Sequence, residues 1–257
     1  MVGKVPAARQ TLAILSYLAS RPGPVGAAAI ARDVGIARST TYHLLNELGD
    51  VDFIVHFPEE RTYGLGVAAF EIGSAYLRHE PLERLARPVL AQLVRETTQT
   101  AHLGILQGSE TVYLLKEQPR TALTLITDIG VRLPAHLTAS GRAMLAHLPA
   151  AQVRALYPSS VAFSHRTSAG PSSLRELRER LRVERERGWA NEVGEVTLGF
   201  ASVAACVFDH GGRPLASVSV TFTDAVVGGK RDRLGAAVVA AAEAVTNRIS
   251  GRRPRTR

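Results

Sequence analysis

The sequence is poor in cysteine and in long apolar runs. Its only cysteine, Cys206, has no second cysteine with which to form an internal disulfide. The longest nearly uncharged apolar stretch, Leu234 to Val245, contains Glu243 and is much shorter than the roughly 20 apolar residues that a membrane-spanning helix needs. The N-terminus has no apolar signal core followed by a small-residue cleavage site. We therefore expect a cytoplasmic protein without a membrane-spanning helix.

The sequence also lacks the usual signatures of catalysis and of metal binding. Ser140 lies in Thr-Ala-Ser-Gly-Arg rather than in the Gly-x-Ser-x-Gly turn of a hydrolase, and we find no glycine-rich phosphate loop and no acid pair at catalytic spacing. His102, His136 and Cys206 lie outside any metal-binding spacing, and such isolated residues are usually core residues. We expect no catalytic residue, no metal and no cofactor.

Positive charge is concentrated at one end of the 257 residues. The net charge is +8, yet residues 1–70 contain equal numbers of basic and acidic residues. The last ten residues contain five arginines and no acid. A basic terminal tail is more often a solvated end than a binding arm, so the high isoelectric point is weak support for nucleic-acid binding.

The N-terminal segment predicts a winged helix-turn-helix. Arg21-Pro22-Gly23-Pro24 ends a first helix, because proline lacks an N–H group and disfavours helical geometry before it. Gly35 permits a turn between two further helices, and Pro58-Glu59-Glu60 separates two strand-like runs. The expected helices are 7–19, 27–33 and 38–48, and the expected wing strands are 51–57 and 61–65.

The third of these helices is the candidate DNA reader. Leu44, Leu45 and Leu48 are expected to face the core, which leaves the polar side chains outward. A helix that enters the major groove needs short polar side chains near its N-terminus. These outward residues are Ser39, Thr40, His43 and Asn46, preceded by Arg38. Capping of the helix by Ser39 is the alternative. Acidic residues close to the wing weaken the case for phosphate binding there: Asp50, Asp52, Glu59 and Glu60.

The rest of the chain predicts a larger α+β domain. Its strands and helices are segregated rather than regularly alternating, which favours a largely antiparallel sheet. We find no internal repeat. The expected helices are 67–78, 82–97, 139–147, 172–188 and 230–249, and the expected strands are 102–107, 111–117, 200–209 and 214–222. The Arg/Glu-rich run 175–187 is expected to be a solvated helix with ion pairs along its face.

The segment from Gly130 to Gly141 is a candidate anion site. Small residues at a helix start leave backbone N–H groups accessible, and the helix dipole favours a carboxylate there. From these residues alone, a simple N-cap by Thr138 is the favoured alternative.

Several ordered motifs resemble the IclR family of bacterial transcriptional regulators. The resemblance covers roughly residues 7–250. It is carried by 29–45 (Ala-Ile-Ala-Arg-Asp-Val-Gly-Ile-Ala-Arg-Ser-Thr-Thr-Tyr-His-Leu-Leu), 63–66 (Tyr-Gly-Leu-Gly), 134–146 (Pro-Ala-His-Leu-Thr-Ala-Ser-Gly-Arg-Ala-Met-Leu-Ala), 188–190 (Gly-Trp-Ala), 199–205 (Gly-Phe-Ala-Ser-Val-Ala-Ala) and 217–220 (Ser-Val-Ser-Val). The family usually has arginine where this chain has His43, so its DNA half-site is expected to differ.

The resemblance implies the function of each domain. The first domain is expected to bind double-stranded operator DNA through Arg38, Ser39, Thr40, Tyr42, His43, Asn46 and Arg61. The larger, GAF-like domain is expected to bind a small carboxylate effector through Gly130, Val131, Thr138, Ala139, Met144, Glu192, Ser202, Ser219 and Thr221. The hydroxyls of Ser219 and Thr221 lie two residues apart on an expected strand, so they share one face.

These expectations combine into one domain plan. Residues 1–66 form the DNA-binding domain, 67–80 a linker helix, 81–250 the effector-binding and oligomerisation domain, and 251–257 a basic tail. We expect a homodimer or homotetramer, because one recognition helix reads only a few base pairs. The alternatives are a metabolite-binding module or enzyme whose N-terminal domain contacts proteins, and a regulator whose larger domain serves only oligomerisation.

Overall fold

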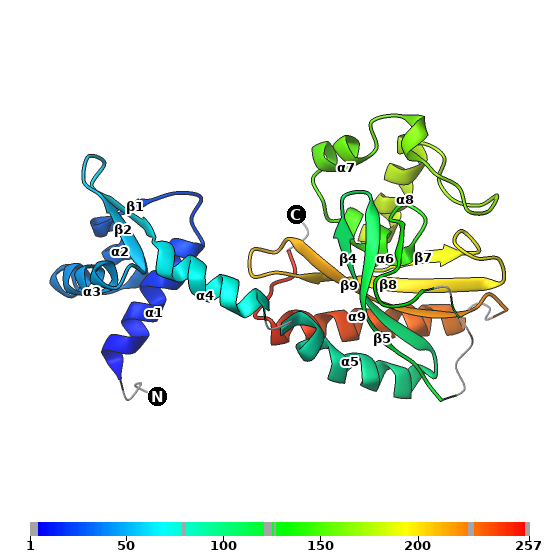
Figure 1. Cartoon of the computed structure of the whole chain (residues 1–257), viewed down its shortest axis with the longest axis horizontal. Helices are drawn as coiled ribbons and strands as arrows, with labels where there is room; N and C mark the ends of the chain where they lie inside the picture. Colours follow the sequence, from blue (N-terminus) through cyan, green and yellow to red (C-terminus); the bar gives the residue numbers. More distant parts are fainter. Residues whose placement is uncertain (1–4, 79–80, 121–124, 126, 226–228, 255–257) are drawn as a thin grey trace. The chain divides into compact units, whose positions relative to one another are not determined.

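The computed structural model describes residues 5–78, 81–120, 125, 127–225 and 229–254. Its contacts divide the chain into two compact units, one up to Pro81 and one from Leu82 onward (Figure 1). Each unit has its own apolar core. The predicted fold class, a winged helix-turn-helix followed by a larger α+β domain, is confirmed.

The smaller unit is built around three helices and a short antiparallel sheet of order β1-β3-β2. Its elements are α1 (Pro6–Ala19), β1 (Val25–Gly26), α2 (Ala27–Val34), α3 (Arg38–Asp50), β2 (Ile54–Phe57), β3 (Thr62–Leu65) and α4 (Val67–Arg78). The core contains Ile14, Leu18, Ala27, Ile30, Ile36, Leu45, Leu48 and Ile54.

The turn between α2 and α3 depends on Gly35. Its φ of 74° lies in the left-handed region, which glycine adopts without steric cost. Beyond this turn, Leu45 and Leu48 of α3 are buried as predicted, and Leu44 packs partly against the same core. The capping alternative for Ser39 is wrong, because Ala37 is the N-cap residue and no side chain caps α3.

The larger unit contains a six-stranded antiparallel sheet of order β6-β5-β4-β9-β8-β7. Its strands are β4 (Thr100–Gln107), β5 (Glu110–Glu117), β6 (Arg132–Pro134), β7 (Ala190–Val193), β8 (Phe200–Phe208) and β9 (Pro214–Thr223). Its helices are α5 (Pro81–Thr97), α6 (Ala139–Leu145), α7 (Ala150–Leu156), η1 (Ser160–Ala162), α8 (Leu174–Arg187) and α9 (Gly229–Arg248).

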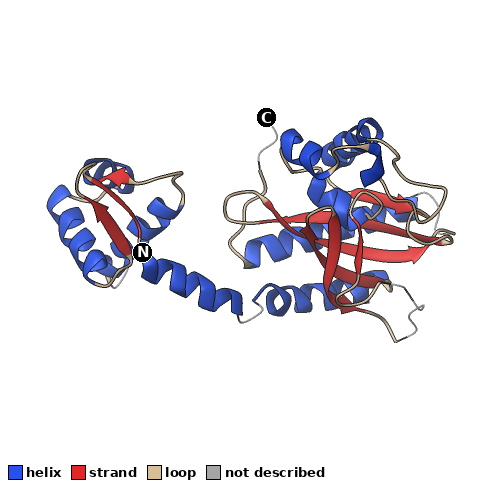
Figure 2. Ribbon diagram, turned by 45° about the horizontal axis from the view of Figure 1, so that its top comes forward, coloured by secondary structure: helices blue, strands red, loops and turns tan. Residues whose placement is uncertain are grey.

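Helices cover both faces of this sheet (Figure 2). Helices α5 and α9 pack on one face, where alternate strand residues such as Ala201, Val203, Val218 and Val220 join Leu90 in the core. Helix α6 packs on the other face, and α8 packs against α6. Because side chains alternate along a strand, Ser202 and Thr221 face the α6 side.

Two features of the larger unit differ from the sequence-based expectations. The short elements β6, β7, α7 and η1, like β1 in the smaller unit, were not predicted, because so few residues establish no periodicity. The described arginines of the tail are exposed, as expected of a solvated end, but hydrogen bonds also join them to the domain. The N–H of Arg252 donates to the Asp209 carbonyl (3.0 Å), and Arg253 pairs with Glu243 (3.1 Å).

The start of α6 lies so close to the preceding segment that Gly141 has no room for a side chain. A Cβ atom there would overlap the carbonyl oxygen and Cβ of Ala135. We expect Gly141→Ala to lower the free energy of unfolding by about 1 to 3 kcal/mol, as overpacking commonly does. Chemical denaturation followed by circular dichroism measures the change. Gly49→Ala is the control, because that helical glycine has open space around it; equal stability of the two variants would contradict the prediction.

Candidate functional site

The outer face of α3 presents most of the predicted DNA-contacting residues. Thr40 is half-buried, and the rest of the predicted set is exposed. The exposed residues are Arg38, Ser39, Tyr42, His43 and Asn46 on α3, and Arg61 in the turn between β2 and β3. The structure therefore brings six of the seven predicted residues onto one helix and places Arg61 on the neighbouring hairpin.

The N-terminus of α3 is electrostatically suited to a phosphate. Its first turn has no acidic residue and no capping side chain, so its N–H groups are not neutralised from within the chain. Arg38 lies in that turn, where the helix dipole disfavours a cation. Backbone N–H groups and an arginine at one helix start are a common arrangement for contacting a phosphate.

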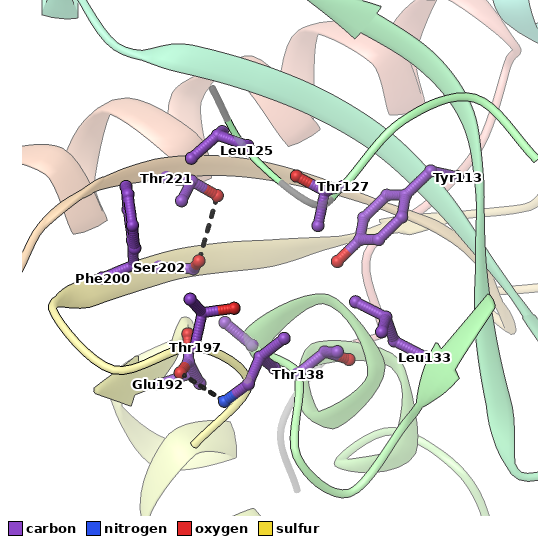
Figure 3. A pocket seen from close by; sticks show the side chains of 12 residues that line it. Tyr113, Leu125, Thr127, Leu133, Thr138, Glu192, Thr197, Phe200, Ser202 and Thr221 are labelled. Carbon is purple, nitrogen blue, oxygen red and sulfur yellow. Dashed lines mark hydrogen bonds between the residues drawn. The ribbon is translucent and has the colours of Figure 1, made fainter. Parts of the chain in front are cut away.

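A cavity lies in the larger unit between the α6 face of the sheet, the start of α6 and the loop between β7 and β8 (Figure 3). The cavity is partly open and has a volume of about 50 Å³. Its lining residues are Tyr113, Leu125, Thr127, Leu133, Thr138, Ala139, Glu192, Val196, Thr197, Phe200, Ser202 and Thr221. This lining combines hydroxyl groups, one carboxyl group and apolar side chains.

Five of the nine residues predicted to bind an effector line this cavity: Thr138, Ala139, Glu192, Ser202 and Thr221. The other four are not part of its lining. Gly130 and Val131 are joined to Tyr113 through backbone hydrogen bonds of 2.8 and 3.2 Å. Met144 packs with Cys206 in an apolar cluster. Ser219 is buried on β9, two residues before Thr221.

The sequence did not single out several lining residues, among them Tyr113, Thr127, Leu133, Thr197 and Phe200. Figure 3 shows the Tyr113 hydroxyl pointing toward the middle of the cavity, opposite Ser202 and Thr221. Burial raises the pKa of Tyr113 to about 12, so its hydroxyl keeps its proton and can donate a hydrogen bond. No local motif marks these residues, because they meet only through the order of the strands.

Two of the lining hydroxyl groups bond to each other, and a third fixes the start of α6. Ser202 and Thr221 share a hydrogen bond of 3.0 Å between β8 and β9. Thr138 Oγ1 accepts the N–H of Gly141 (2.9 Å) and shares a hydrogen bond of 3.0 Å with Thr111. The predicted N-cap role of Thr138 is therefore confirmed, and the same residue lines the cavity.

Glu192 supplies the carboxyl group of the cavity. It is 3% exposed, and its Oε1 accepts the backbone N–H groups of Glu195 (2.8 Å) and Val196 (3.1 Å). Burial raises the pKa of Glu192 from 4.5 to about 7, and the charge of Glu195 acts in the same direction. The two N–H groups and Arg142 oppose this rise. Near neutral pH this group therefore exists in both protonated and ionised forms.

A buried ion network lies behind Glu192. The Arg142 guanidinium is fully buried and pairs with Glu184 (3.0 Å) and with Glu195 (2.8 Å), and Glu195 also pairs with Arg180 (2.7 Å). Arg182 forms the expected surface pairs along α8, but Glu184 of the same run is buried. Leu177 and Leu181 are also buried, so Glu184 is the one charged residue of the run that departs from the expectation of a solvated helix.

The described residues contain no group of three or more His, Cys, Asp or Glu that could hold a metal ion. None of the described helices is long and apolar enough to cross a membrane.

Comparison with known proteins identifies relatives over nearly the whole chain. The family described as "Bacterial transcriptional regulator IclR C-terminal" matches residues 74–247, and the "IclR helix-turn-helix domain" matches residues 7–56. The transcriptional repressor IclR of Escherichia coli is 29% identical over 98% of this chain and 92% of its own length. The glycerol operon regulatory protein of Streptomyces coelicolor is 30% identical over 86% of each chain. The crystal structure of the Agrobacterium tumefaciens repressor BlcR has a TM-score of 0.62 at 25% identity and covers 96% of this chain and 97% of its own.

Burial of Glu192 makes the stability of the larger unit depend on pH. Its folded pKa of about 7 exceeds 4.5, so between these values the folded state keeps a proton that the unfolded chain releases. Stability therefore falls as pH rises through this window, by up to about 1.4 kcal/mol for each unit of pKa shift. Glu192→Gln does not titrate and keeps an oxygen that can accept both N–H groups.

We expect the free energy of unfolding of Glu192→Gln, relative to the unsubstituted protein, to increase from pH 5 to pH 8. Urea denaturation at several pH values measures this difference. A difference that stays constant across the range would show that Glu192 does not titrate as its burial requires.

Proposed function

The chain belongs to the IclR family of bacterial transcriptional regulators and is a DNA-binding regulator rather than an enzyme; from this premise we propose that it represses transcription from a specific operator in the cytoplasm, under the control of a small carboxylate. The observation that carries the proposal is the exposed polar face of α3 in one unit together with a polar cavity in the other.

The proposed DNA contacts follow from the chemistry of α3. Ser39, Thr40, His43 and Asn46 offer short donors and acceptors to base edges in the major groove. Arg38 would contact a phosphate at the start of the helix, and Arg61 would do so from the wing. The base readout would therefore belong to the helix, and the wing would add affinity without adding sequence preference.

We further propose that the protein acts as a homodimer or a higher homo-oligomer. Two recognition helices related by two-fold symmetry match a palindromic operator, which one helix cannot read. Exposed apolar side chains on α4 support a contact with a second copy: Phe70 is 73% exposed, Ile72 59% and Val67 58%. Burying such side chains between two copies would be favourable.

The cavity is proposed to hold the effector. Ser202 and Thr221 share one hydrogen bond, which leaves one of their two O–H groups free to donate to a carboxylate oxygen, and protonated Glu192 can also donate. The cavity volume of about 50 Å³ suits a molecule of few atoms. Thr138 and Ala139 would contact the same ligand from the start of α6.

Regulation follows from linkage. An effector changes the affinity for DNA only if it binds better to one arrangement of the DNA-binding units than to another. By the same linkage, operator DNA changes the affinity for the effector by the same factor.

The recognition helix can be tested by selecting fragments of the source genome at near-physiological salt, with and without candidate effectors. We expect the unsubstituted protein to enrich a few palindromic sites, because salt suppresses non-specific phosphate binding. The triple variant Ser39→Ala, Thr40→Ala, His43→Ala should lose them while staying folded, since alanine favours helix. Glu47→Ala, an exposed change on the same helix, should keep the sites. Equal enrichment by the triple variant would refute direct readout by α3.

The wing can be tested at Arg61, whose φ of 52° is left-handed. Arg61→Gly tolerates this conformation and removes the charge. We expect weaker binding to all DNA sequences alike and a shallower salt dependence, with the slope of log K against log salt changing by about 1. Fluorescence anisotropy at several salt concentrations measures both. An unchanged slope would remove Arg61 from the interface.

The effector site can be tested by calorimetric titration with a panel of small carboxylic acids and with glycerol. Thr221→Val removes a lining hydroxyl and should weaken binding of any acid that binds by about tenfold, the effect of one lost hydrogen bond to a charged group. Ser217→Ala is the matched control, because Ser217 lies on the same strand and donates to the Gly104 carbonyl outside the cavity. If only glycerol binds, the proposed effector is a polyol rather than a carboxylate. If nothing in the panel binds, the result favours a domain that serves only oligomerisation.

A further inference from the structure

Two buried polar side chains, Thr127 in the cavity lining and His102 behind that lining, have no hydrogen-bond partner among the described residues. His102 is 1% exposed, and neither ring nitrogen makes a hydrogen bond. Thr127 is 8% exposed, lines the cavity, and its hydroxyl is also unpartnered. Buried polar groups in native proteins are nearly always bonded, and leaving one unbonded costs about 1 to 3 kcal/mol. A bound molecule that reached these groups would therefore supply a partner that the described residues do not.

The sheet places His102 beside the cavity. Its neighbours Ala101 and Leu103 belong to the core under α5 and α9, so alternation turns His102 to the opposite face. Its cross-strand partner on β9 is Ser219, two residues from the lining residue Thr221. The ring of Tyr113, which also lines the cavity, lies 5.0 Å from the His102 ring between centroids.

The chemistry of the two groups defines what would satisfy them. Burial lowers the pKa of His102 to about 4, so near neutral pH its ring is uncharged and has one N–H donor and one acceptor nitrogen. The backbone of Thr127 lies close to the ring, but no hydrogen bond of ordinary geometry joins them, so both ring nitrogens lack a partner. The nearby charges of Lys116 and Asp128 pair with each other at 3.7 Å.

A ligand hydroxyl fits this pair better than a carboxylate does. A hydroxyl both donates and accepts, so it can donate to the acceptor nitrogen of His102 and accept from the Thr127 hydroxyl. An ionised carboxylate only accepts and leaves that nitrogen unpaired. An effector with a carboxylate and no hydroxyl would therefore leave one buried polar atom of the chain unsatisfied.

We propose that His102 and Thr127 form a hydroxyl-recognising arm of the cavity, which makes the protein prefer a hydroxy acid over the corresponding unsubstituted acid. This inference rests on the proposed function and narrows its ligand class. It assigns specificity to two residues that the family motifs do not mark. The competing account is an ordered water that bonds to both side chains whatever the ligand is.

The test compares matched acids on the full-length protein. Calorimetric titrations use lactate against propionate, and 3-hydroxybutyrate against butyrate. The unsubstituted protein is expected to bind the hydroxy member of a pair at least tenfold more tightly, because a site built for a hydroxyl rejects the analogue that lacks it. His102→Phe and Thr127→Val should each reduce this preference to about twofold or less, while affinity for the unsubstituted acid changes little.

A second buried histidine provides the control. His136 is also 1% exposed and its Nδ1 is unpartnered, but its Nε2 bonds to the Ser164 carbonyl (2.9 Å) and its ring packs against Tyr157 and Phe163, neither of which lines the cavity. His136→Phe should keep the hydroxyl preference. Thermal unfolding checks that each variant is folded, and Thr127→Val, which keeps the shape of the side chain, decides the question alone if His102→Phe does not fold.

The possible outcomes separate this inference from the proposed function. Binding of both acids of a pair without a preference, or a preference that survives Thr127→Val and His102→Phe, overturns the hydroxyl arm and leaves carboxylate sensing intact. If the unsubstituted protein binds none of the four acids, the hydroxyl arm and the carboxylate assignment are both overturned.

Discussion

The larger unit depends on one buried cation. In the Arg142 guanidinium, Nε donates to Glu184, Nη1 donates to Glu195 and to the His136 carbonyl, and Nη2 donates to the Asn191 carbonyl. These acceptors come from α8, the loop after β7, the segment before α6, and β7 itself. Because a buried charge is tolerated only when it is paired, all four segments must meet at this point. Two opposite walls of the cavity, the start of α6 and the loop after β7, are thereby fixed by the same side chain.

The network also gives the cavity a route to the outer helix. Glu192 accepts hydrogen bonds from the N–H groups of Glu195 and Val196. The Glu195 carboxylate forms ion pairs with Arg142 and Arg180. A ligand that changes the hydrogen bonds or the charge of Glu192 therefore acts on the loop after β7 and, through Glu195, on α8. Coupling of this kind needs no large movement, because each link is a direct contact between neighbouring groups.

Local patterns predict the smaller unit better than the larger one. Leucine spacing, Gly35 and the proline-rich stop predict α1, α2 and α3 to within a few residues, because each signal lies inside the element it describes. Family motifs add Thr138, Glu192 and Ser202, but neither source marks Tyr113 or Thr127. Their roles come from the neighbours that the strand order supplies. Glu184 shows the same limit, since its local sequence is that of a solvated helix and its partner Arg142 lies 42 residues away.

The pairing of β4 with β9 joins segments far apart in the chain, with Thr100 opposite Thr221. During synthesis the N-terminal unit is complete long before β9 leaves the ribosome, and domains generally fold in that order. The cavity gains its Thr221 wall only at the end of this process. A chain that ends before β9 would keep α3 but would lack the Thr221 wall of the cavity. Such a chain could contact DNA without responding to a ligand in the cavity.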